Sequence, residues 1–131
     1  MNMNRIRQNV HDNLVDRIFR HPEIIGINGN QIDAKCKDFE LYTMDGELYV
    51  TPDIYFKMPD CGLLLEVKGS NSQSCHQKGL DQLGKMKDWA GWNAGNVGNI
   101  YLGLIWPKVL VHNPTSVKNG RLDAELNYMV V

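Results

Sequence analysis

Two acidic residues and one lysine lie in two segments of the chain that alternate between apolar and polar residues. Asp53 follows Pro52 in the first segment, and Glu66, Val67 and Lys68 close the second. Alternate side chains of a β-strand lie on one face, so Glu66 and Lys68 are expected to share a face. If the two segments pair as antiparallel strands, Asp53 should lie beside Glu66, with Lys68 one step further along.

This group of charges suits a divalent cation better than a hydrophobic core. Two carboxylates at short range repel each other, and a buried ammonium group is costly unless it is paired. Mg²⁺ binds carboxylate oxygens together with water and phosphate oxygens. A metal at Asp53 and Glu66 would acidify a bound water and neutralise charge on a phosphate, while Lys68 orients the water or stabilises that charge. The alternatives are a solvated Glu66–Lys68 ion pair and a Pro-Asp turn.

The elements that must position these residues predict a mixed α/β layer. Ile6, Val10, Leu14 and Ile18 follow one another at intervals of four, which is typical of an amphipathic helix over residues 4–20. Pro22 ends that helix, because a residue before proline is pushed out of the helical region.

Period-two patterns predict three strands after this helix. Segments 40–44 and 47–51 flank Asp45-Gly46, a strong signal for a β-hairpin. The second strand is expected to continue through Pro52 to Phe56, with a bulge or edge at the proline. A turn over residues 58–62 then leads to the third strand, over residues 62–68.

A helix over residues 75–89 and a strand over residues 100–106 complete the expected core. Segment 109–112 is a further short strand candidate, and segment 122–131 is either a strand or a segment that contacts a partner. The predicted fold is one domain over residues 1–131, of class α/β, with a mixed central sheet flanked by helices in the order α-β-β-β-α-β.

Pro52-Asp53 and Glu66-Val67-Lys68 together resemble the two-part signature of the PD-(D/E)xK nuclease superfamily. In spacing and size the chain is most similar to the archaeal-type Holliday junction resolvases, over about residues 10–106. The resemblance implies a restriction-endonuclease-like core and a Mg²⁺-dependent DNA endonuclease, with Mn²⁺ as a possible substitute. It also implies Asp53 and Glu66 as metal ligands, the Val67 carbonyl as a third, and Lys68 as the catalytic lysine.

Two further positions are suggested by the superfamily pattern. Gln82 and Leu83 match the start of a Gln-hydrophobic-x-x-Tyr motif, but Met86 stands in the tyrosine position. Gln82 is therefore a candidate for positioning near the metal or phosphate, or else an exposed helix glutamine. The superfamily also places an acidic ligand on the first helix, where Asp12, directly or through water, or His11 would serve; solvated polar residues are the alternative.

Basic residues on the two helices are candidates for phosphate contacts. Lys78 and Lys85 lie beside Trp89 on the second helix, and Arg17 belongs to the first. Each of them taken alone is better explained as a solvated side chain.

Composition narrows the function classes. With 43% hydrophobic residues and 22% charged residues, the chain can form one modest core, and no apolar run has the length of a membrane span. Three cysteines without CxxC spacing argue against a disulfide scaffold or zinc ribbon, and indicate reduced thiols in the cytoplasm. The net charge of −1 removes the simplest argument for nucleic acid but does not exclude DNA as a partner.

Branched DNA is the preferred substrate, because so short a chain has little surface for reading bases. A two-fold homodimer would most easily cut two strands, with an interface drawn from segments 100–106, 109–111 or 128–131. A repair, restriction or mobile-element nuclease of the same fold is the alternative, as is a nucleic-acid-binding module without turnover.

Overall fold

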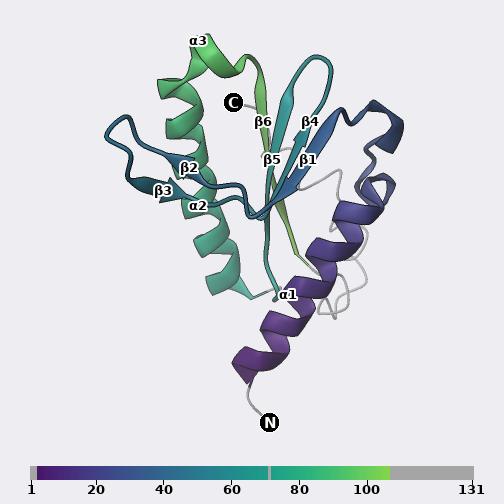
Figure 1. Ribbon diagram of the computed structural model, residues 1–131. Coiled ribbons are helices and arrows are strands. Elements are labelled where there is room, and N and C mark those ends of the chain that lie inside the picture. Colours follow the sequence, from purple (N-terminus) through teal and green to yellow (C-terminus); the bar gives the residue numbers. More distant parts are fainter. Residues whose placement is uncertain (1–2, 71, 107–131) are drawn as a thin grey trace.

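A four-stranded mixed sheet runs through the centre of the computed structural model, which describes residues 3–70 and 72–106, with side chains from residue 8 (Figure 1). Its strands, in the order β1-β4-β5-β6, are β1 (Ala34–Lys37), β4 (Ile54–Lys57), β5 (Gly62–Val67) and β6 (Ile100–Ile105). Neighbours pair antiparallel except β5 and β6, which are parallel. Parallel strands need a long crossover, and helix α2 (Gln73–Trp92) supplies it.

Helix α1 (Met3–Arg20) covers one face of the sheet. It ends before Pro22, as predicted, and the short 3₁₀ helices η1 (Pro22–Ile25) and η2 (Gly29–Gln31) lead from it to β1. Its apolar stripe buries Val15 and Ile18. The core on this side is formed by the buried side chains Val15, Ile18, Ile25, Ile27, Ile54, Phe56, Leu63, Leu65, Val67 and Ile105.

Helix α2 covers the opposite face, and the short helix α3 (Ala94–Val97) follows it. The Ser72 hydroxyl caps α2 by accepting the Cys75 N–H at 3.2 Å. Gly79 lets the helix approach β6 closely, because a Cβ at that position would collide with the Leu104 side chain. The buried residues on this side are Leu41, Val50, Leu64, Leu83, Met86, Ala90, Ile100, Leu102 and Leu104.

The predicted hairpin forms a separate two-stranded sheet, β2 (Leu41–Tyr42) with β3 (Leu48–Val50). Gly46 adopts a φ of 85° in its turn, which explains the Asp45-Gly46 signal. The hairpin lies over α2 (Figure 1), where Leu41 and Val50 join the α2 side of the core.

The predicted order of elements was wrong before the second helix, where five strands precede α2 instead of three. The expected strand over residues 47–56 is divided into β3 and β4, because the chain bends at residues 51–53, around Pro52. Val50 therefore faces α2, whereas Ile54 and Phe56 face α1. Strand β1 was not predicted at all.

Strand β1 is an edge strand whose four residues are all exposed. Two of them are lysines that extend over the Phe19 ring of α1, with Nζ at 4.5 Å (Lys35) and 5.1 Å (Lys37) from the ring centroid. Lys35 also donates to the Phe19 carbonyl at 2.8 Å, and Lys37 pairs with Asp16 at 3.1 Å. The edge of the sheet therefore carries two lysines in fixed positions, of which Lys37 is paired with a carboxylate.

The predicted strand over residues 100–106 corresponds to β6, whose side chains lie in the core except for Tyr101. Of the three segments predicted to form a dimer interface, β6 is thus largely used inside the domain. Segments 109–112 and 122–131 lie outside the described residues. Within the described part of the chain, no helix has the length and apolar character needed to cross a membrane.

Candidate functional site

Asp53 lies directly before β4, where the chain turns away from the hairpin. Ile54 pairs with Leu65, so the next position along brings Asp53 beside Glu66, the arrangement expected from the sequence. The Asp53 side chain is nearly buried, and its Oδ2 accepts the Val67 backbone N–H at 2.7 Å. Asp53 is therefore fixed against β5 by the main chain of the Glu-Val-Lys segment.

Glu66 is a carboxyl group inside the domain, with only 3% of its surface exposed. Its Oε2 lies 3.3 Å from Lys68 Nζ, while its Oε1 is buried without a hydrogen-bond partner among the described residues. Burial raises the pKa of Glu66 to about 8, and the charge of Asp53 adds to this effect, although Lys68 opposes it. A buried carboxylate oxygen with no donor is costly in a folded protein; a proton on Glu66 lowers this cost in the metal-free protein, and a bound cation would remove it.

His11 of α1 is the residue of the first helix that reaches Asp53. Its Nε2 lies 3.1 Å from Asp53 Oδ1, and its Nδ1 lies 3.0 Å from Asp12 Oδ1. The hydrogen bond to Asp53 is the largest cause that raises the pKa of His11 to about 9, against the lowering effect of burial. At neutral pH a positively charged imidazolium therefore lies beside Asp53.

Among the described residues, Asp12 contacts the site through His11. Its side chain is 62% exposed and also accepts a hydrogen bond from Gln8 Nε2 at 2.9 Å. A metal-binding histidine usually donates its second ring N–H to a carboxylate, which is the relationship of His11 to Asp12. The proposed ligand role of Asp12 stays a prediction, and His11 is the nearer candidate.

The donor set of the site fits a divalent cation. Two adjacent ligands at right angles, each about 2.1 Å from a metal, lie about 3.0 Å apart. The 3.1 Å between His11 Nε2 and Asp53 Oδ1 suits such a pair as well as a hydrogen bond. Among the described residues, no three His, Cys, Asp or Glu side chains form a ligand set as they stand. Both oxygens of Asp53 are engaged by hydrogen bonds, so a cation would replace the proton between His11 and Asp53.

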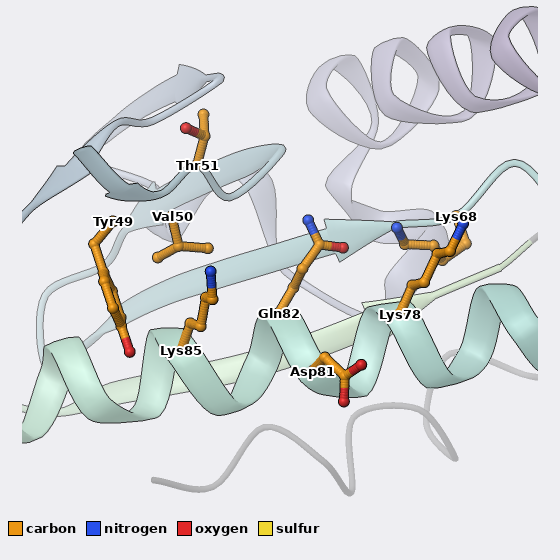
Figure 2. Close-up of a pocket in the computed structure, with 8 residues that line it drawn as sticks. All are labelled: Tyr49, Val50, Thr51, Lys68, Lys78, Asp81, Gln82 and Lys85. Carbon is orange, nitrogen blue, oxygen red and sulfur yellow. The ribbon is translucent and has the colours of Figure 1, made fainter.

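An open groove of about 530 Å³ begins at Lys68 and lies between α2 and the segment that contains β3 (Figure 2). We call it the α2 groove. Lys78, Gln82 and Lys85 line it from the helix, so three residues predicted from the sequence lie along one surface with Lys68. Gln82 points from α2 toward the opposite segment in Figure 2, and its Oε1 is buried without a partner among the described residues.

Four residues that line the groove were not predicted from the sequence: Tyr49, Val50, Thr51 and Asp81. Tyr49 and Thr51 form the wall opposite α2, together with Val50. The alternation of polar residues at 49, 51 and 53 does not identify them, because the bend at residues 51–53 interrupts the strand. Arg17, by contrast, is exposed on α1, across the sheet from α2, and the structure does not bring it to the groove.

A comparison of the chain with protein-family models finds no match, and a comparison with curated proteins finds none either.

Proposed function

We propose that this protein is a metal-dependent endonuclease that hydrolyses backbone phosphodiesters of DNA. The observation that carries the proposal is the buried, unpartnered Oε1 of Glu66, next to Asp53 and Lys68. A structural ion pair explains Oε2, which meets Lys68, but leaves Oε1 without a reason to be buried. A divalent cation bound at Asp53 and Glu66 gives that oxygen a function.

The arrangement of elements supports a restriction-endonuclease-like core of the PD-(D/E)xK type. In this proposal β4 and β5 supply Asp53 and Glu66-Val67-Lys68 at one end of the sheet, and α2 follows the signature as the family pattern requires. The difference in the strands before β4 does not affect this part of the resemblance, because Asp53 and Glu66-Val67-Lys68 follow β1, β2 and β3 in the chain.

The chemistry assigns a separate task to each side chain. Mg²⁺ or Mn²⁺, when bound, lowers the pKa of an attacking water and neutralises charge on the phosphate. Asp53 and Glu66 hold the cation, with the Val67 carbonyl as a further ligand. Lys68, fixed 3.3 Å from Glu66, donates to the water or to the phosphate oxygen that gains charge. The Gln82 amide, which points into the groove, positions the phosphate.

We propose branched DNA as the substrate, in the manner of a Holliday junction resolvase, and a two-fold homodimer in the cytoplasm as the active form. A repair, restriction or mobile-element nuclease would use the same residues. The exposed lysines Lys78 and Lys85 support a contact with phosphates next to the reacting group.

A nucleic-acid-binding module without turnover is the second candidate. It is favoured by the two hydrogen bonds to Asp53, which satisfy both of its oxygens without a metal. In such a protein the His11 imidazolium would be a permanent structural substitute for the cation, and divalent metals would have no effect.

Incubation with end-labelled DNA separates the two candidates. A four-way junction, a flap, a forked duplex and a blunt duplex are each incubated with the protein in Mg²⁺, in Mn²⁺ and in EDTA. The nuclease proposal expects cleavage of at least one branched substrate in metal and none in EDTA. Binding without cleavage in every condition would support the non-catalytic module.

A further inference from the structure

The α2 groove has two different walls. Helix α2 contributes Lys78, Gln82 and Lys85, and the wall opposite consists of Tyr49, Val50 and Thr51 (Figure 2). Lys68 lies at one end of the groove and Tyr49 at the other. Any chain-like molecule that occupies it therefore passes directly from Lys68 along the surface of α2.

The charges that face the groove are mainly positive. Lys78 and Lys85 form no ion pair within the described residues. Asp81 is the acidic residue of the lining, and it accepts a hydrogen bond from Gln77 at 3.0 Å. Two lysines without carboxylate partners, seven residues apart on one helix, lie about 10 Å apart along its axis, so their flexible side chains can contact different phosphates of one strand.

Aromatic rings lie at the end of the groove away from Lys68. The Tyr49 ring has Lys85 Nζ 5.4 Å from its centroid and the Trp92 ring 4.9 Å away. Trp92 is 53% exposed even though it is the largest kind of apolar side chain. Surfaces that bind single strands combine exposed aromatic rings with nearby lysines. Any base can stack on the ring, and the lysines contact the phosphates.

The size of the groove suits a short unpaired segment of nucleic acid. Its volume of about 530 Å³ lies within the range of small-ligand pockets, roughly 300–1,000 Å³.

We propose that the α2 groove binds an unpaired DNA strand that leads away from the phosphodiester at Lys68. Lys78 and Lys85 contact its phosphates, and a base stacks on Trp92. This inference rests on the proposed nuclease function and makes it more specific: the substrate is DNA in which a duplex meets a single strand, such as a flap or a fork.

Binding without cleavage tests the inference. Fluorescence anisotropy in EDTA compares a labelled blunt duplex with the same duplex that carries an oligothymidylate overhang. The wild type should bind the overhang substrate more tightly. Trp92→Ala should weaken overhang binding roughly fivefold or more, the equivalent of one stacked base, and leave blunt-duplex binding unchanged. The Lys78→Ala/Lys85→Ala variant should reduce the slope of log affinity against log salt by about 1.4, since each phosphate contact on a single strand contributes about 0.7.

Lys87→Ala is the matched control, because Lys87 is an exposed lysine of α2 that does not line the groove. If the alanine variant melts below the wild type, Trp92→Phe replaces it, because phenylalanine keeps a ring beside Tyr49. The Trp92→Phe variant should retain part of the overhang binding. Equal affinity of the wild type for both substrates would overturn the inference, as would groove variants that match Lys87→Ala. Failure of the nuclease proposal is distinguishable, because it leaves overhang binding intact and removes only cleavage.

Discussion

Asp53 Oδ2 accepts the backbone N–H of Val67 at 2.7 Å, so the first carboxylate of the site is tied to the residue between Glu66 and Lys68. The bond crosses from the bend before β4 to the end of β5. It fixes the separation of the two acidic side chains through the main chain, independently of any cation. Substitutions at Glu66 and Lys68 can therefore change the charge of the site without releasing Asp53.

Lys68→Ala is expected to lower DNA cleavage by about 10²–10³ while leaving the fold intact, because the ammonium acts on charge that develops in the transition state. Removing the partner of a buried carboxylate is usually costly. Here the pKa of Glu66 is already raised to about 8, so the residue stays neutral without Lys68. Single-turnover cleavage assays and thermal melts measure the two effects, with Lys87→Ala as the control. Cleavage at the wild-type rate would show that Lys68 is not catalytic.

Metal binding should raise the melting temperature of the wild type. A ligand that binds only the native state at one hundred times its dissociation constant adds about 2.7 kcal/mol to the free energy of unfolding. Asp53→Asn should abolish the gain from Mg²⁺ or Mn²⁺ and lower the metal-free stability, because it removes the charge that pairs with the His11 imidazolium. Melts in EDTA and in each metal, repeated with a DNA duplex present, provide the measurement. If neither metal changes the melting temperature of the wild type, with or without DNA, the metal site is contradicted.

His11 should give the site a preference for metals that bind imidazole. Nitrogen ligands favour Zn²⁺ or Ni²⁺ over Mg²⁺, which prefers oxygen. His11→Gln is expected to lower Zn²⁺ affinity far more than Mg²⁺ affinity in titration calorimetry. Asp12→Asn, which removes the carboxylate behind the imidazole, should cost about ten- to a hundredfold in Zn²⁺ affinity. His21→Gln is the control, and equal losses for both metals would argue against His11 as a ligand.

Metal-free stability should fall as the pH rises. The folded-state pKa of His11, about 9, exceeds the reference value of 6.5, so its stabilising effect is complete below pH 6.5 and is lost as the pH passes through 9. The pKa of Glu66 is raised from 4.5 to about 8, which gives a loss of the same sign between those values. Urea unfolding in EDTA between about pH 4.5 and pH 9 measures the loss of stability from each group. His11→Asn should remove the upper part of the slope and Glu66→Gln the lower part; unchanged slopes would refute these assignments.

Gly79→Ala should destabilise the domain by about 1–3 kcal/mol, because the added methyl group collides with Leu104 where α2 packs on β6. Gly84 lies on the same helix with no atom near its missing Cβ. Gly84→Ala should therefore stabilise the protein by up to about 1 kcal/mol through helix propensity. Urea midpoints give both values. A Gly79→Ala variant as stable as Gly84→Ala would show that the helix does not lie this close to the strand.

The elements with strong periodic patterns could be predicted from the sequence. Apolar residues at intervals of four specify α1, and Asp45-Gly46 specifies the hairpin turn. β1 was missed, because its apolar members Ala34 and Cys36 are small and all four of its residues are exposed, so its short alternation marks no buried face. The bend at Pro52 was also missed, since the period-two pattern continues through it while the strand does not.

The site was predictable in part for the same reason. Alternation along a strand places Glu66 and Lys68 on one face whatever the rest of the fold, and antiparallel pairing adds Asp53. The choice between His11 and Asp12 could be made only from the three-dimensional structure. These neighbours differ by one position on α1, and only the rotation of the helix against the sheet determines which of them reaches Asp53, 42 residues away in sequence.

Strand β1 has a consequence for self-association. An exposed edge strand offers unpaired backbone groups to any other strand, which is a common route to aggregation. Here Lys35 and Lys37 are held over Phe19 on that edge, and a second copy that approached edge to edge would bring its own two lysines against them. Their repulsion disfavours a continuous intermolecular sheet through β1. The lysines on β1 thus disfavour fibre-like assembly, and the second subunit of a two-fold dimer would bind at a surface other than the β1 edge.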